Sequence, residues 1–83
     1  MADLARTPKQ LGNAIRNARK GRGLSQTELG ERSGLRQATI SQIEAGRGGA
    51  KLENILKVLA VLGLELRIDP RSLSSGTRIE DIF

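Results

Sequence analysis

Four side chains between residues 37 and 42 carry the clearest chemistry in this sequence. They bear amide, hydroxyl or methyl groups: Gln37, Ala38, Ser41 and Gln42. On a helix these positions share one face, because residues three and four apart are neighbours. A glutamine can pair bidentately with adenine, and an alanine can contact a thymine methyl group. The pattern favours a helix lying in a DNA major groove, with Gln37 first for base contact; the alternative for each residue is a solvent-facing position.

A second short helix is expected to precede this one and to position it. Ser25 and Glu28 have the spacing of a capping box, which marks a helix start. Gly34 follows where this helix should end, and glycine readily adopts the positive φ that such a turn requires. Residues 25–46 therefore read as two short helices joined by a tight turn.

Two further helices flank this unit. Thr7 and Pro8 give a strong helix start, followed by apolar residues with the spacing of one buried stripe. After the glycine-rich loop at 46–49, a helix with apolar residues on more than one face begins near Leu52. We expect four helices in all, at 8–21, 26–32, 37–45 and 52–62.

Composition limits the function. The chain has 83 residues, enough for one small domain, and it lacks cysteine, histidine, tyrosine and tryptophan. We therefore expect no metal site, no cofactor and no catalytic residue, and hence no enzyme. No apolar run is long enough for a membrane span, and no secretory signal is visible at the N-terminus. The expectation is a cytoplasmic, nucleoid-associated protein without a membrane or small-molecule partner.

The charge is unevenly distributed along the chain. Residues 1–51 hold ten basic and four acidic side chains, a net charge of +6, whereas residues 52–83 have a net charge of −1. A basic half of this kind is typical of a protein with a polyanionic partner such as nucleic acid. A solvated basic surface with no such partner is the alternative, and basicity alone does not separate the two.

After Gly63 the apolar period changes from helical to alternating. Leu64, Leu66 and Ile68 alternate with charged residues until Pro70, which predicts one β-strand at 64–70. A single strand leaves its hydrogen-bonding edge unpaired. Pairing with the same strand of a second chain would satisfy it, and helix four would add an apolar face to this homodimer. An extended segment held on the monomer is the alternative.

Residues 71–83 begin with a polar, serine-rich stretch and are expected to form a flexible tail, as are residues 1–6 at the other end. The tail finishes with three large apolar side chains: Ile79, Ile82 and Phe83. They suggest a peptide that docks on a partner; a frayed end is the alternative.

The stretch from Leu24 to Gly46 resembles the Xre/Cro-type helix-turn-helix family. It has the L-[ST]-Q-x-x-L start, the glycine turn and the I-[SE]-x-[IL]-E-x-G end at the family spacing. The resemblance extends from Thr7 to Pro70, and the Leu-Gly-Leu-Glu-Leu-Arg-Ile-Asp-Pro segment after helix four is similar to that of HipB-type antitoxins.

This resemblance implies an all-α fold: a λ-repressor-like helix-turn-helix bundle of four helices at 7–63, with one short C-terminal β-strand that pairs across a homodimer. It also implies a repressor that binds a palindromic double-stranded operator, regulates its own operon and acts as the antitoxin of a HipA-type serine/threonine kinase toxin. The apolar end of the tail would dock on that kinase.

Further site residues follow from position and from the resemblance. Gln26 starts a helix and is a candidate phosphate contact, as are Arg36, Thr39, Arg47 and Lys51. The resemblance implies a structural ion pair between Arg19 and Glu44 that orients the reading helix.

The sequence departs from the family at two positions. Arg36 stands where a Ser or Thr cap is usual, and Gly30 stands where the family usually has Ala in mid-helix. Two other functions remain as alternatives: a stand-alone phage-type repressor without a toxin partner, and a protein-interaction adaptor that no longer reads DNA.

Overall fold

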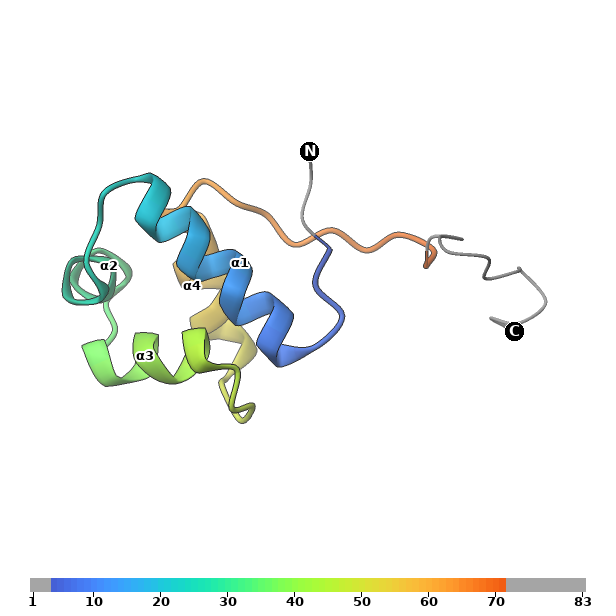
Figure 1. Cartoon of the computed structure of the whole chain (residues 1–83), viewed down its shortest axis with the longest axis horizontal. Coiled ribbons are helices and arrows are strands. Elements are labelled where there is room, and N and C mark those ends of the chain that lie inside the picture. The colour runs from blue at the N-terminus through green and yellow to red at the C-terminus, as the bar shows by residue number, and fades with distance from the viewer. Residues whose placement is uncertain (1–3, 72–83) are drawn as a thin grey trace.

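The computed structural model describes residues 4–71, in which four helices form a small bundle (Figure 1). The sequence predicted each helix to within one residue at either end. The helices and their bounds are α1 (Pro8–Gly21), α2 (Gln26–Ser33), α3 (Gln37–Ala45) and α4 (Leu52–Val61).

Each of the first two helices begins at a side-chain cap. The Thr7 hydroxyl accepts a hydrogen bond from the backbone N–H of Gln10, and Pro8 occupies the first helical position of α1. At α2 both halves of the capping box are present: the Ser25 hydroxyl accepts from the Glu28 backbone, and the Glu28 carboxylate accepts from the Ser25 backbone. These caps satisfy backbone donors that a helix start otherwise leaves unpaired.

The core contains one buried aliphatic cluster with side chains from all four helices. Four of its members are fully enclosed, namely Ile15, Leu29, Ile40 and Val58. Leu24, Ile43, Leu59 and Leu62 complete it. The helix α3 packs against both α1 and α2, while α2 also packs against α4. Two neighbouring helices therefore hold α3 along its buried side.

Backbones approach closely at two glycines. A Cβ atom added at Gly12 would lie 2.5 Å from the Ile43 carbonyl oxygen, so α1 and α3 touch through their main chains. At Gly30 an added Cβ would lie 2.7 Å from the carbonyl oxygen of Leu35, in the turn that follows α2. This contact explains the glycine in mid-helix: it lets the turn fold back against α2, where the Leu35 N–H donates to the Gly30 carbonyl.

The turn between α2 and α3 depends on Gly34, whose φ of 74° lies in the left-handed region. The next helix then starts without a side-chain cap, because Arg36 makes no capping hydrogen bond. Arg36 therefore does not replace the Ser or Thr cap that is usual in the family, and backbone donors in the first turn of α3 lack a side-chain acceptor.

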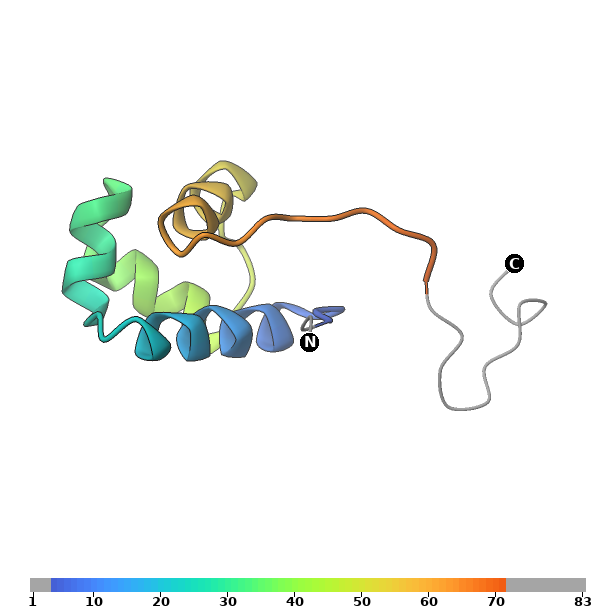
Figure 2. The ribbon, with the colours of Figure 1, turned by 90° about the horizontal axis from the view of Figure 1, so that it is seen from above.

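Residues 64–71 leave the helical body as an extended arm, as Figure 2 shows from above. Within the described part of this single chain they pair with no other segment and form no strand. The strand expected at 64–70 needs an edge to pair with, and residues 4–71 supply none, so pairing across a homodimer stays a prediction. The Leu64 N–H does bond back to the Leu59 carbonyl, which fixes where the arm begins.

Candidate nucleic-acid interface

The helix α3 has one buried and one open side. Ile40, Ile43 and Glu44 are buried on the core side. The four predicted base-reading residues lie on the other side: Gln37, Ala38 and Gln42 are exposed, and Ser41 is half-buried. Their hydrogen-bonding and methyl groups are thus brought together on one accessible helix face, as the helical spacing predicted.

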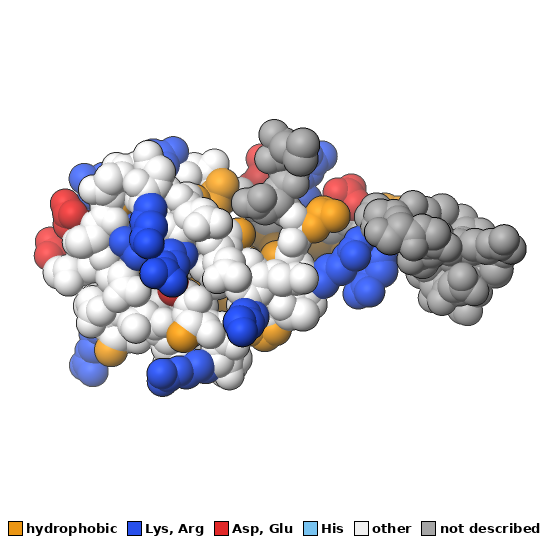
Figure 3. Space-filling model, in the orientation of Figure 1, with side chains coloured by type: hydrophobic (Ala, Val, Ile, Leu, Met, Phe, Trp, Pro, Cys, Tyr) orange, Lys and Arg blue, Asp and Glu red, His pale blue; other side chains and the backbone are white. Residues whose placement is uncertain are grey.

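Cationic side chains lie at both ends of this face. Arg36 precedes α3, Arg47 follows it in the glycine-rich loop, and Lys51 precedes α4; all three are exposed. Thr39, the remaining phosphate candidate within α3, is half-buried. Figure 3 shows several Lys and Arg side chains spread over the face that carries α1 and α3. This arrangement suits a helix flanked by two runs of phosphates.

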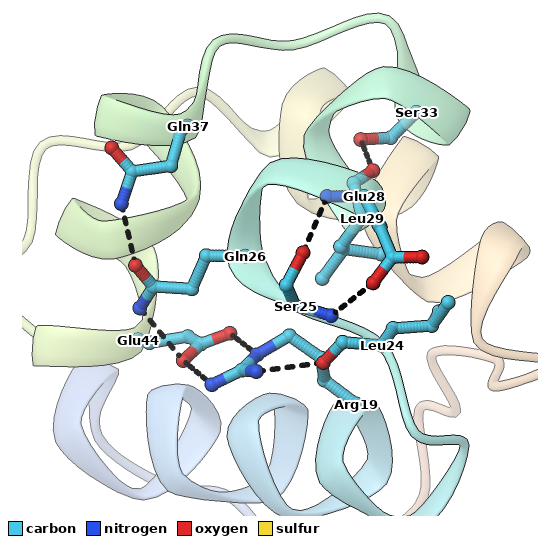
Figure 4. A network of polar contacts seen from close by, with 9 residues as sticks. All are labelled: Arg19, Leu24, Ser25, Gln26, Glu28, Leu29, Ser33, Gln37 and Glu44. Carbon is cyan, nitrogen blue, oxygen red and sulfur yellow. Dashed lines mark hydrogen bonds and ion pairs between the residues drawn. The ribbon is translucent and has the colours of Figure 1, made fainter.

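The buried side of α3 holds an ion pair with α1. Arg19 Nε donates to Glu44 Oε2 at 2.7 Å, and Arg19 Nη2 donates to Glu44 Oε1 at 3.1 Å (Figure 4). The third donor, Nη1, bonds to the Leu24 carbonyl oxygen at 2.8 Å. The two side chains retain only 10% and 3% of their exposure. This is the pair that the resemblance implies, and its bidentate geometry fixes α3 against α1.

Gln26 occupies a position that the sequence did not reveal. It is half-buried, and its Nε2 donates to Glu44 Oε1 at 3.2 Å while its Oε1 accepts from Gln37 Nε2 at 2.6 Å. Gln26 is the first residue of α2 and Gln37 is the first residue of α3. A glutamine at the first position of each helix was therefore the only signal in the sequence. That the two amides meet depends on the angle between α2 and α3, which spacing alone does not give.

The capping box lowers the pKa of its own glutamate. The Ser25 backbone N–H, and then its hydroxyl, hold the pKa of the Glu28 carboxyl below its ordinary value, with a smaller contribution from Arg32. Glu28 therefore stays ionised at the N-terminus of α2, where a negative charge is favourable.

A second surface, at the other end of the chain, is apolar. Leu52 and Leu56 on α4 are exposed, and Leu64, Leu66 and Ile68 on the arm are 40%, 51% and 93% exposed. Figure 3 shows hydrophobic side chains open to solvent between the helical body and the arm. A groove of about 340 Å³ also lies here, lined by the N-terminus of α1, the C-terminus of α3, Ile55 and Leu66.

Other kinds of site find no support in residues 4–71. No cluster of three acidic side chains there could hold a metal ion. No helix among the same residues has the length and apolar character to cross a membrane. Ile79, Ile82 and Phe83, the predicted docking residues, lie outside the described residues.

Comparison with known proteins shows which family has this arrangement of helices. The family model described as helix-turn-helix matches residues 15–68, which spans the ion pair, the amide pair and the open face of α3. The chain belongs to the helix-turn-helix family. This helix-turn-helix chain is 36% identical over 62 residues to the antitoxin HipB of Escherichia coli K12, covering 75% of the chain and 70% of that protein.

Two further comparisons define the relationship. The chain is 36% identical over 75 residues to an uncharacterised helix-turn-helix regulator, y4dL, of Sinorhizobium fredii, covering 90% of this chain but only 38% of that longer protein. In the solved HipA-HipB-O2-O3 complex, a chain superimposes with a TM-score of 0.78 at 31% identity, covering 86% of this chain and all of that one. This helix-turn-helix protein is a transcriptional regulator related to HipB antitoxins, a family of DNA-binding proteins rather than enzymes.

Proposed function

We propose that this chain is the antitoxin of a HipA-type serine/threonine kinase toxin, and that it represses its own operon by binding a palindromic operator as a homodimer. The observation that carries the proposal is the likeness, over the full length of the matched chain, to a protein solved together with HipA. A dimer that reads both halves of an operator would be placed at the nucleoid.

The open face of α3 would enter the major groove. Gln37 would pair with a base, Ala38 would meet a thymine methyl group, and Ser41 and Gln42 would contact the following bases. Replacing Gln37 with Ala should cost about 1–3 kcal/mol on the cognate operator and relax the preference at one base pair. An equal loss on all DNA sequences would contradict a base-reading role.

Phosphate contacts would supply most of the affinity and its salt dependence. Arg36, Arg47 and Lys51 are the charged candidates, because all three are exposed around α3 and the start of α4. Thr39 is an uncharged one. Gln26 would add a contact through the amide N–H that its two hydrogen bonds leave over.

The dimer would bury the apolar surface of α4 and the arm. Leu64, Leu66 and Ile68 would face the partner's strand, and the two backbones would then complete the hydrogen bonds that the single chain lacks. This surface is the physical reason for proposing a homodimer: an exposed, alternating edge of this kind otherwise invites uncontrolled association.

The experiment that tests the proposal has two arms. A duplex selected from a random library with the purified protein should be palindromic, and it should match DNA upstream of the protein's own gene. Co-expression with the neighbouring gene should yield a stable complex if that gene encodes a HipA-type kinase. Removing residues 71–83 should spare DNA binding and weaken that complex, if Ile79, Ile82 and Phe83 dock on the kinase.

Three results would decide against parts of the proposal. A dimer that binds its selected operator but has no kinase neighbour would indicate a stand-alone repressor. Binding that does not distinguish selected from random DNA at any salt concentration would indicate a protein-interaction adaptor. A truncated chain that unfolds would show that residues 71–83 are structural.

A further inference from the structure

An apolar groove of about 340 Å³ lies where α1 begins, α3 ends and the arm passes. Its lining includes Leu11, Ile43 and Ile55 from three helices and Leu66 from the arm. Figures 1 and 2 both show the arm leaving the body towards the end at which α1 begins. Sites for small organic ligands have volumes of about 300–1,000 Å³, so a groove of this size admits a few large side chains.

Positive charge borders the groove. Arg6 lines it, and three exposed cations, Lys9, Arg47 and Lys51, are each next in sequence to a lining residue. The start of α1 and the end of α3 touch here, because a Cβ atom added at Gly46 would collide with the Cα atom of Lys9. None of the lining residues, all of which lie within 4–71, is acidic. An occupant should therefore combine large apolar side chains with negative charge.

Residues 79–83 of the same chain have this combination. They read Ile-Glu-Asp-Ile-Phe, and they contain the only aromatic side chain and the only two adjacent acidic residues of the sequence. The apolar side chains, at positions 79, 82 and 83, have the spacing of one helix face, which leaves Glu80 and Asp81 outside that face. The segment thus matches the groove in both apolar character and charge.

The chain between the groove and this segment is long enough to return. From Leu66 at the groove, residues 67–71 carry the chain at most about 18 Å away. Residues 72–79 can span up to about 28 Å on the way back. Residues 72–78 include three serines and a glycine, a composition typical of linkers. Position 79 can therefore reach the groove of its own chain.

We infer that residues 79–83 occupy this groove of their own chain when no kinase holds them, with Glu80 and Asp81 beside Arg47 and Lys51. The docked segment then competes with DNA phosphates for these two cations. The docking stands without the proposed function, whereas the competition rests on it. Removing residues 71–83 should consequently spare DNA binding and also strengthen it.

The docking is tested by NMR on the full-length protein purified without a kinase. The sequence has no cysteine, so Thr77→Cys accepts a single nitroxide label next to the docking segment. The label should broaden the amide signals of the groove glycines Gly46, Gly48 and Gly49. It should leave the signal of Gly21, at the other end of α1, unchanged.

A matched variant separates docking from mere proximity of the label. Replacing Ile79, Ile82 and Phe83 with Ser keeps the tether and the label, and it should abolish the broadening. A mixture of labelled protein without ¹⁵N and unlabelled ¹⁵N protein detects docking in the groove of a second copy. This mixture should show no broadening of the groove signals.

The competition is tested by anisotropy titration of a random-sequence duplex. The triple Ser variant should bind it about three- to tenfold more tightly, because a short tether gives an effective concentration in the mM range and a weak segment is then mostly docked. Ala5→Trp, at an exposed residue that lines the groove, should expel the segment and have the same effect. Asn17→Trp, exposed on α1 outside the groove, is the control and should bind as the wild type does.

Different results overturn different claims. Unchanged groove signals, or equal broadening in the triple Ser variant, would contradict the docking. Broadening in the mixture would assign the segment to the groove of a second copy and contradict docking within one chain. Broadening with an unchanged affinity for DNA would contradict the competition alone. A wild-type protein and variants that bind no DNA would contradict the proposed function and leave the docking intact.

Discussion

In α1–α3 the buried polar side chains find their partners within the same chain, whereas many apolar side chains of α4 and the arm face solvent. Arg19, Glu44 and Gln26 satisfy one another, and no buried side-chain nitrogen or oxygen of the described residues lacks a partner. Ile68, by contrast, is 93% exposed. Helices α1–α3, which hold the predicted base-contacting residues (the reading unit), are complete in one chain, whereas the apolar surface of α4 and the arm is uncovered.

The two regions also differ in charge. The reading unit lies in the half of the sequence with a net charge of +6, while residues 52–83 have a net charge of −1. A basic surface attracts DNA but repels a second copy of itself. The exposed apolar side chains of α4 and the arm lie in the nearly neutral half, so the proposed self-association would not bring two strongly basic surfaces together.

The largest effect should come from breaking the buried ion pair. Glu44→Ala leaves the Arg19 guanidinium buried without its counter-charge, and we expect a loss of about 3–5 kcal/mol in the free energy of unfolding. Urea denaturation measures it. Glu65→Ala, at an exposed glutamate of the arm, is the control and should change stability by no more than about 0.5 kcal/mol. A similarly small loss of unfolding free energy in both variants would mean that the stability of α1–α3 does not depend on this ion pair.

A smaller loss is expected where α1 touches α3. Gly12→Ala forces a Cβ atom against the Ile43 and Glu44 carbonyl oxygens, so α1 has to shift, at a cost of about 1–3 kcal/mol. Gly21→Ala in the same helix meets nothing within 4 Å and should instead gain up to about 1 kcal/mol from helix propensity. Thermal unfolding of both variants compares them directly, and a stabilised Gly12→Ala would contradict the close approach.

The charge difference can be tested with two arginines. Arg47→Ala should weaken binding to all DNA sequences and lower the slope of log affinity against log salt by about one. Arg67→Ala, in the arm, removes the same charge from the other region and should leave the slope unchanged. Anisotropy titrations over several salt concentrations measure the slope for both variants. An equal decrease in the two slopes would mean that the arm contacts DNA as much as the loop after α3 does.

The smallest effect concerns the capping box. Because the pKa of Glu28 is lower in the folded chain than its ordinary value of 4.5, its ionised form stabilises the fold above that pH. This contribution is lost as the pH falls through the lowered pKa. Glu28→Gln keeps an acceptor for the Ser25 N–H but cannot titrate. The wild-type protein should therefore lose more stability than Glu28→Gln between pH 6 and pH 3 in urea titrations at each pH. If both proteins lose the same free energy of unfolding over this pH range, the titration of Glu28 does not contribute to the pH dependence of stability.

Local signals predicted the helices because each start, stop and apolar stripe lies within a few residues of sequence. Thr7, Ser25 and Gly34 act on their own helices, so their effects could be assigned without a fold. The glycine at position 30 could not be explained in this way. Its reason is a contact with the Leu35 carbonyl that exists only once the turn has formed.

Side-chain contacts between helices were harder to predict from the sequence. The open face of α3 followed from helical spacing, and the resemblance implied the Arg19–Glu44 pair. The link from Gln26 to Gln37 joins residues 11 apart on helices whose crossing angle the sequence does not specify. The arm is a different case: its alternating pattern predicts a strand, but a strand needs a partner to pair with, and the part of the chain that the structure describes does not contain one.

We propose that α1–α3 are complete in one chain and that a second copy of the chain completes the arm. Sedimentation equilibrium of wild-type protein and Ile68→Asp tests it most directly. Ile68 is 93% exposed, so the substitution should leave the monomer folded. The wild type should be a dimer, and Ile68→Asp should dissociate at least about tenfold more readily, because a buried isoleucine contributes about 1.5–3 kcal/mol. A monomeric wild type, or equal dissociation constants, would contradict the claim.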